Sequence, residues 1–228
     1  MAKVIAFDTE TTGFVEPEII EAAWVEIRDI DSFMCFNSFE ARYKPTKPIE
    51  LGALSTHHIL DTELDGCPPS ASFALPDDVV YLIGHNIDFD WGVIGKPDIK
   101  RICTLALARK YLPGLDSHKQ SALIYHFYED APSTARDMVK NAHSALPDVV
   151  NCVIVLRFLI GIIRDSGVVI DDWSDLWDVS EEARIPEIMT FGKHKGDHMR
   201  DVPRSYKQWL LRQEDMDPYV RLSIERFW

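Results

Sequence analysis

Three strand-like stretches lie within the first 43 residues, and this succession constrains the fold more than any other feature of the chain. An apolar run, Lys3–Phe7, ends at Asp8, and the stretches Ile19–Ile27 and Phe33–Tyr43 are rich in β-branched and aromatic residues. Such residues favour strands. Short turns between consecutive strands, such as the one signalled by Thr12-Gly13, join strands that run in opposite directions. The sequence therefore predicts an antiparallel meander at the start of a sheet.

The chain then alternates short apolar runs with helical patterns. Val79–Ile83 and Ile99–Cys103 are candidate buried strands. Helices are expected near residues 55–60, after His85-Asn86, after a cap at Thr104, and over residues 123–128 and 144–163. Three leading strands followed by this alternation predict an α/β domain in which helices flank a mixed sheet, first antiparallel and then parallel.

Charge is distributed unevenly along the chain. The 228 residues have a formal net charge of −13, which argues against a broad basic face. Residues 171–187 hold seven acids and one arginine, and we interpret them as an acidic linker. Residues 188–228 hold eight Lys/Arg and six acids, a net of +2, and are predicted to form a small separate module. This division leaves residues 1–170 as one main domain.

Cysteine spacing and the N-terminal sequence indicate the cellular compartment. The four cysteines show no CxxC spacing, which indicates free thiols in a reducing environment instead of a zinc site or a disulfide framework. Met1-Ala2-Lys3 leads directly into a strand-like run without a signal-peptide core. The most apolar stretch, Val149–Ile163, contains Asn151 and Arg157 and is shorter than a bilayer span, so it predicts a buried helix. We therefore expect a cytoplasmic protein with no membrane partner.

Two carboxylates follow the first apolar run, at Asp8 and Glu10. Residues i and i+2 of a strand point to the same face, so these two acids lie close together. They repel each other unless a cation sits between them, and a hard, oxygen-preferring ion such as Mg²⁺ suits such a site. A strand end whose acids are simply solvated is the alternative.

Two further motifs follow predicted buried elements. His85-Asn86-Ile87-Asp88-Phe89-Asp90 comes directly after a strand, where loops often carry functional groups, although Asn86 could also serve as a helix cap. His143-Ser144-Ala145-Leu146-Pro147-Asp148 opens the long helix. Because Pro147 suits a first turn, Asp148 is expected on that turn, and His143 is expected in the loop before it.

In this order the motifs F-D-T-E-T-T-G, H-N-x-x-F-D and A-H-x-A-x-x-D resemble those of the DEDDh 3′–5′ exonucleases, which have a ribonuclease H-like fold. The resemblance spans roughly residues 3–165 and includes the segments 48–59 and 102–114. It implies two Mg²⁺ ions, replaceable by Mn²⁺, that stabilise the attacking and leaving oxygens of phosphodiester hydrolysis. The implied metal ligands are Asp8, Glu10, Asp90 and Asp148, with Asp8 shared by both ions.

The resemblance also implies the other roles at the site. His143 accepts the proton of the attacking water, for which an imidazole is a suitable base. Asp88 rivals Asp90 for the metal, and Asp90 is favoured because it follows Phe89 as in the family pattern. The residues expected to contact the substrate in this domain are Thr9, Thr11, Gly13, Phe14, His57, Asn86 and Phe89.

Phe14 departs from the pattern of similar sequences, which usually have an aliphatic residue after the glycine of the first motif. An aromatic side chain at this position either stacks on the terminal base of the substrate or packs into the core. The sequence leaves both readings open.

The C-terminal module places Lys193 and Lys195 between two glycines. Glycines let the backbone approach a phosphate closely, and lysines neutralise its charge. Tyr206, Trp209 and Leu210 repeat at helical spacing and indicate a small core. The module is therefore predicted to be a nucleic-acid clamp, and a structural mini-domain with an exposed turn is the alternative.

The resemblance therefore implies an Mg²⁺-dependent 3′–5′ exodeoxyribonuclease that releases nucleoside 5′-monophosphates in DNA repair or end processing. The expected partners are nucleic-acid 3′ ends, with DNA favoured over RNA. An exoribonuclease of the same superfamily is one alternative, because recognition of the 2′-hydroxyl depends on pocket shape. A catalytically silent module that binds nucleic acid or a polymerase is another, although a binder has no need of four acids and a histidine. The oligomeric state stays open, a homodimer included.

Overall fold

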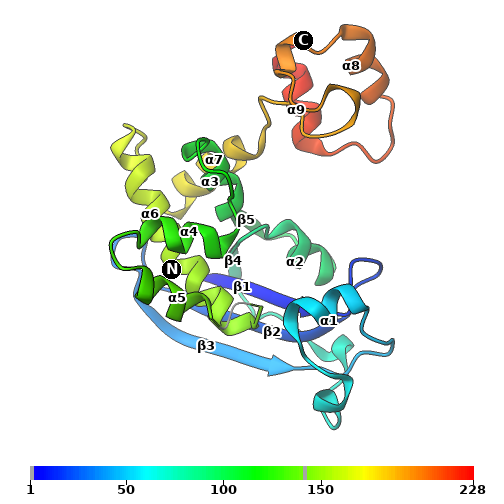
Figure 1. The fold of residues 1–228 in the computed structure, drawn as a ribbon, viewed down its shortest axis with the longest axis vertical. Helices are drawn as coiled ribbons and strands as arrows, with labels where there is room; N and C mark the ends of the chain where they lie inside the picture. The colour runs from blue at the N-terminus through cyan, green and yellow to red at the C-terminus, as the bar shows by residue number, and fades with distance from the viewer. Residues whose placement is uncertain (1–2, 141–142) are drawn as a thin grey trace. The chain divides into compact units, whose positions relative to one another are not determined.

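The computed structural model describes residues 3–140 and 143–228 (Figure 1). They divide into two compact units, unit 1 (Met1–Ser180) and unit 2 (Glu181–Trp228). Each unit has its own hydrophobic core.

Unit 1 is built on a five-stranded sheet with the order β3-β2-β1-β4-β5. Strands β1 and β2 pair antiparallel, as do β2 and β3, whereas β4 pairs parallel with β1 and with β5. The strand bounds are β1 Lys3–Thr11, β2 Ile19–Ile27, β3 Cys35–Arg42, β4 Val79–Gly84 and β5 Lys100–Cys103. The predicted mixed sheet, an antiparallel meander followed by parallel strands, is thereby confirmed.

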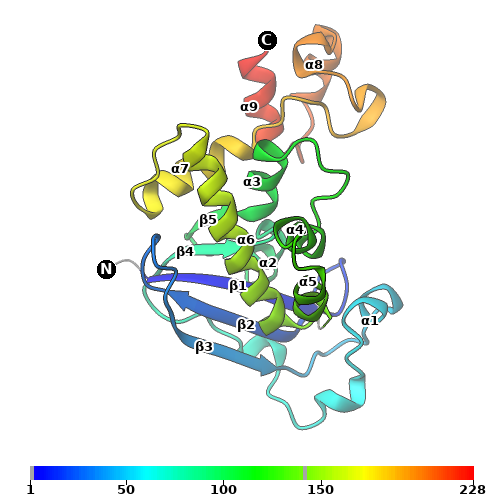
Figure 2. The ribbon, with the colours of Figure 1, turned by 60° about the vertical axis from the view of Figure 1, so that its left-hand side comes forward.

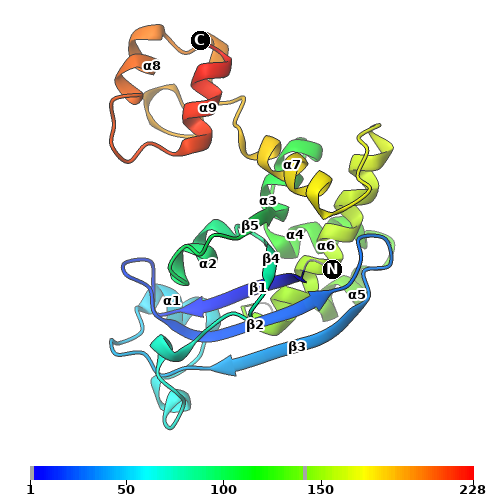
Figure 3. The same cartoon turned by 180° about the vertical axis from the view of Figure 1, so that it is seen from behind.

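Among the described residues, seven α-helices lie within or begin in unit 1, besides two short 3-10 helices at Asp61–Leu64 and Ser70–Ser72. Their bounds are α1 Leu51–His57, α2 Asp88–Val93, α3 Thr104–Tyr111, α4 Gln120–Phe127, α5 Pro132–Val139, α6 Ala145–Asp165 and α7 Trp173–Arg184. Helix α6 packs along β1 and β2, beside α3, α4 and α5 (Figure 2). Viewed from behind, β1, β2 and β3 run side by side in the sheet (Figure 3).

Helix α6 is the central helix of unit 1. Its 21 residues are long and apolar enough to cross a membrane by length and composition alone. In this fold, however, Val149, Val155, Leu156 and Leu159 are fully buried. The predicted buried helix is confirmed, and it extends beyond the apolar run that indicated it.

Several boundaries differ from the sequence-based expectations. Helix α1 begins at Leu51 and ends at His57, because His58 adopts a left-handed conformation (φ 59°) that stops the helix. Thr104 is not a helix cap: it is the first residue of α3, and its hydroxyl donates to the carbonyl of Gly84. Within the described residues Asn86 makes no side-chain cap for α2, since the cap position is Ile87.

The segment predicted as an acidic linker is mostly helical. Helix α7 fills residues 173–184, and the boundary between the two units falls inside it, after Ser180. Leu176 and Ser180 are fully buried, and the Ser180 hydroxyl accepts a hydrogen bond from the Cys103 amide (2.9 Å). Residues 171–187 were predicted to be a solvated linker because seven of them are acids and only a few are buried in the fold.

Unit 2 is a small helical module with helices α8 (Arg204–Leu210) and α9 (Pro218–Arg226). Its core consists of Met189, Met199, Val202, Leu210, Val220 and Ile224. Asp217 caps α9 by accepting hydrogen bonds from the amides of Tyr219 and Val220. The predicted core residue Leu210 is buried, whereas Trp209 is half exposed.

Candidate active site

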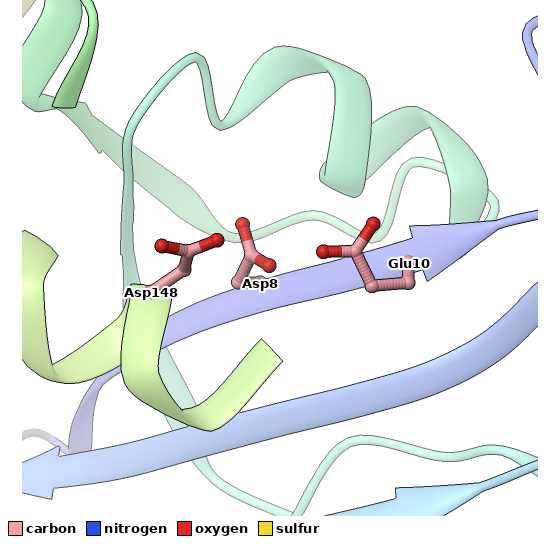
Figure 4. A group of neighbouring side chains, drawn as sticks. All are labelled: Asp8, Glu10 and Asp148. Carbon is pink, nitrogen blue, oxygen red and sulfur yellow. The ribbon is translucent and has the colours of Figure 1, made fainter. Parts of the chain in front are cut away.

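Three of the predicted metal ligands converge at one point of unit 1. Asp8 and Glu10 lie two residues apart on β1 and therefore project from the same face of the sheet. Asp148 lies on the first turn of α6, which packs on β1. Each of the three carboxylates contributes an oxygen, and these oxygens lie within 4.8 Å of one another. Figure 4 shows the three side chains pointing toward a common centre.

The pKa values of all three carboxyl groups are raised. Burial raises the pKa of Asp8 well above its usual value, and the charges of Asp90 and Glu10 raise it further. The pKa of Glu10 rises to about 8, chiefly through burial and then through Asp148. Burial also raises the pKa of Asp148. Such a group is stable only when protons or cations neutralise it.

The donor set fits a divalent cation. All three side chains offer carboxylate oxygens, which are the ligands that Mg²⁺, Mn²⁺ and Ca²⁺ prefer. A cation bound among them would also offset the repulsion that raises their pKa values.

Asp90 lies next to this cluster and is bound to β1. The pairing of β1 with β4 ends at Ala6–Ile83, so the amide of Thr9 has no β4 partner. One Asp90 oxygen takes that place and accepts hydrogen bonds from the Thr9 amide (3.0 Å) and hydroxyl (2.7 Å). Burial raises the pKa of Asp90 to about 7 against these hydrogen bonds. Asp90 is therefore close enough to affect Asp8 but is not one of the three converging carboxylates.

His143 and Asp148 are connected through the backbone. His143 lies in the loop before α6, with a left-handed conformation (φ 69°) and an exposed side chain. Its amide donates to Asp148 Oδ2 (2.8 Å), and Gln120 Nε2 donates to Asp148 Oδ1 (3.2 Å). Both oxygens of Asp148 are thus oriented, and the loop with His143 is held beside the cluster.

Glu21 is a buried acid that the sequence analysis missed. It lies opposite Glu10 in the β1–β2 pairing and is 3% exposed. Its Oε2 accepts a hydrogen bond from the amide of Ala145 (2.9 Å), and its Oε1 accepts one from Arg42 Nε (2.9 Å). Glu21 therefore anchors the start of α6, the helix that carries Asp148. Its partner Ala145 lies 124 residues away in the sequence, so no local pattern indicated this role.

Phe14 does not pack into the core. Its side chain is 82% exposed and meets the ring of Phe89 edge to face, with centroids 5.7 Å apart. One reading of Phe14 is thereby excluded, and the two aromatic residues from separate motifs lie side by side.

The other predicted contact residues of unit 1 differ in conformation and burial. Gly13 has φ 155°, and a Cβ there would lie 2.2 Å from the Glu50 carboxylate, so this position requires glycine. Thr11 donates to the carbonyl of Gly13 (3.1 Å). Asn86 is exposed in a left-handed conformation (φ 76°). His57 is buried, and its Nδ1 accepts the Ile59 amide (3.0 Å).

Lys193 and Lys195 belong to unit 2, where both are exposed.

Comparisons with known proteins agree with the motifs. No family model matches the chain. The chain is 27% identical over 233 residues to exodeoxyribonuclease 10 of Escherichia coli strain K12, covering 96% of each chain, and equally to the protein of that name from E. coli O6:H1. The resemblance predicted from the three motifs is thereby confirmed.

Solved structures share the fold. One is exonuclease X in complex with 5′ overhanging duplex DNA, with a TM-score of 0.54 and 24% identity, covering 76% of this chain and 99% of that one. Another is E. coli exonuclease I in complex with a dT13 oligonucleotide, with a TM-score of 0.56 and 16% identity, covering 73% of this chain and 43% of that one. The ribonuclease H-like fold class is confirmed.

The first prediction concerns stability without metal. The pKa of Glu10 rises from 4.5 to about 8 on folding, so between these values the folded state binds more protons than the unfolded state. The contribution of Glu10 to the free energy of unfolding is then fully present below about pH 4.5 and is lost as the pH rises toward 8. Glu10→Gln removes this loss, so its free energy of unfolding at pH 8 should be higher than that of the wild type by on the order of 2 kcal/mol. Urea unfolding in EDTA across this range measures it. The exposed-surface control Glu129→Gln should follow the wild type, and parallel curves for Glu10→Gln would contradict the prediction.

The second prediction concerns Glu21. Glu21→Ala leaves the Ala145 amide and Arg42 without their buried partner and should lower the free energy of unfolding by about 3 kcal/mol. It should also speed hydrogen exchange at the Ala145 amide. Glu26→Ala, on the same strand, is the control, and a change below about 0.5 kcal/mol is expected there. Equal effects of the two substitutions would show that Glu21 does not anchor α6.

Proposed function

We propose that this chain is a divalent-metal-dependent exonuclease that hydrolyses DNA from its 3′ end and releases nucleoside 5′-monophosphates. The observation that carries the proposal is the convergence of Asp8, Glu10 and Asp148, with Asp90 and the His143 loop beside them. These residues come from three motifs far apart in the sequence. A module that only binds nucleic acid gains nothing from buried, mutually repelling carboxylates.

Asp8, Glu10 and Asp148 would hold the metal, and Asp90 would contribute from the adjoining position on α2. Divalent cations bound at such a site supply positive charge that stabilises the attacking and leaving oxygens in phosphodiester hydrolysis. Mg²⁺ is the proposed ion, since it is bound by few carboxylates and keeps several waters.

His143 is proposed to act as the general base. The reaction adds a water oxygen to the terminal phosphorus and breaks the P–O3′ bond, so one proton must leave the water. An exposed imidazole next to the carboxylate cluster is suited to accept it, and the leaving O3′ oxygen takes up a proton. The hydrogen bond from the His143 amide to Asp148 holds the proposed base close to the proposed metal ligand.

The terminal nucleotide would lie against Phe14 and Phe89. The exposed ring of Phe14 offers a stacking surface, and Phe89 supports it from α2. Thr9, Thr11, Gly13, Asn86 and His57 are proposed to complete the nucleotide site. DNA is the proposed substrate because relatives and structural neighbours are named as deoxyribonucleases or were solved with DNA.

The third prediction tests metal dependence and direction. A 3′-labelled single strand should release labelled mononucleotide at once, whereas a 5′-labelled strand should shorten stepwise. EDTA should abolish both, and Mg²⁺ or Mn²⁺ should restore them while Zn²⁺ is not required. Single-stranded DNA, duplex DNA and RNA are compared side by side. Full activity after thorough chelation would refute the metal mechanism, and faster RNA hydrolysis would assign the chain to exoribonucleases.

The fourth prediction separates Asp90 from its neighbour Asp88. Asp90→Asn keeps an oxygen that can accept the hydrogen bonds of Thr9 but loses the negative charge. Hydrolysis should fall at least about 100-fold, the size of the loss when one group that stabilises transition-state charge is removed, while the unfolding midpoint changes little. Asp88→Asn removes an exposed acid of the same helix that pairs with Arg101 and should retain most activity. The reverse ranking would transfer the metal role to Asp88.

A further inference from the structure

The loop around residues 191–196 packs closely on helix α8 of unit 2. Gly192 has a left-handed conformation (φ 69°), and a Cβ there would lie 2.4 Å from the Tyr206 hydroxyl. Only glycine lets the loop approach Tyr206 this closely. The loop therefore lies directly against Tyr206.

His194 fixes the loop at a second point. Its Nδ1 lies 2.9 Å from Asp197 Oδ2, and its ring meets Tyr206 with centroids 4.7 Å apart. Lys193 and Lys195 flank His194 and are exposed. The two ammonium groups thus extend from a loop whose backbone is held in place.

Aromatic side chains continue this surface. Tyr206 contacts Trp209, one turn further along α8, with ring centroids 5.3 Å apart. Trp209 is 51% exposed, and Phe191, next to Gly192, is 41% exposed. The loop thus contacts α8 through Tyr206, beside the exposed Trp209. Phe191, Lys193, Lys195, Tyr206 and Trp209 are here called the unit 2 face.

We propose that the unit 2 face binds single-stranded nucleic acid, with bases stacked on Trp209 and Phe191 and phosphates neutralised by Lys193 and Lys195. The proposal rests on the proposed function for its substrate class. Exposed aromatic rings next to cations are the combination that binds single strands without sequence preference. Residues 188–228 carry a net charge of +2 and the rest of the chain −15, so this part of the chain repels a polyanion least.

Lys207, on the same helix, serves a different purpose. It is buried, and its Nζ donates to the carbonyl of Phe227 (2.7 Å). Lys207 therefore ties α8 to the end of α9 and is left unchanged in the experiment.

The experiment measures oligonucleotide binding by the full-length Asp8→Ala protein in EDTA, where the probe stays intact. Fluorescence anisotropy of labelled 20-nucleotide oligo-dT and oligo-rU is recorded over a range of salt concentrations. Trp209→Ala should weaken binding about 5- to 150-fold, the range for loss of one stacked base. Lys193→Ala with Lys195→Ala should flatten the logarithmic salt dependence by about 1.4, or 0.7 for each phosphate.

Two variants of the same unit serve as matched controls. Trp228→Ala removes another half-exposed tryptophan, and Arg221→Ala removes one exposed positive charge from α9. Both should bind like the parent. Unchanged affinity in Trp209→Ala and the double lysine variant, or equal losses in the controls, would overturn the proposal. Inorganic polyphosphate binding as tightly as oligo-dT would also overturn it, because the face would then recognise charge alone.

Hydrolysis by the otherwise wild-type protein separates this proposal from the proposed function. Hydrolysis of a saturating trinucleotide in Mg²⁺ is measured alongside binding. Metal-dependent hydrolysis without binding at the unit 2 face would support the proposed function and refute the proposed binding site. Binding at the face in a protein that cannot hydrolyse any 3′ end would refute the proposed function alone.

Discussion

Repulsion among carboxylates at the end of β1 is the constraint on which the architecture of unit 1 depends. Asp8, Glu10 and Asp148 share a space in which their oxygens lie within 4.8 Å of one another, and burial strengthens their mutual repulsion. A chain that only needed to fold would separate these acids. Their convergence requires that the strand and the helix that carry them are held firmly from outside the cluster.

The neighbouring hydrogen bonds provide that support. The Thr9 amide and hydroxyl bind Asp90, and the Ala145 amide and Arg42 bind Glu21. Gln120 and the His143 amide bind Asp148. Each donor is a hydrogen-bond partner for a buried carboxylate, and the bonds from Thr9, Ala145 and Gln120 also join segments that are distant in sequence. The same contacts that make the negative charge tolerable therefore determine where β1, α2 and α6 meet.

The parts of the site that follow from local periodicity could be predicted from the sequence. Alternation along β1 places Asp8 and Glu10 together, and the first turn of a helix places Asp148 after His143. Glu21, Gln120 and the bond between Asp90 and Thr9 depend on strand register and helix packing, which no local pattern encodes. Helix α7 was missed for a related reason: its composition is that of a solvated segment, and the contact of Ser180 with Cys103 exists only in the folded unit.

The premature end of the β1–β4 pairing has a consequence for comparing relatives of this chain. Asp90 accepts the hydrogen bond that a strand partner of Thr9 would otherwise accept. Position 90 therefore has a structural role besides any catalytic one. A descendant that had abandoned hydrolysis would still retain Asp or Asn there. Glu10, whose carboxylate has no such hydrogen bond among the residues that the structure describes, would be free to drift. Among relatives, a protein that has lost Glu10 but kept Asp90 would therefore be a candidate for a binding protein that no longer hydrolyses its ligand.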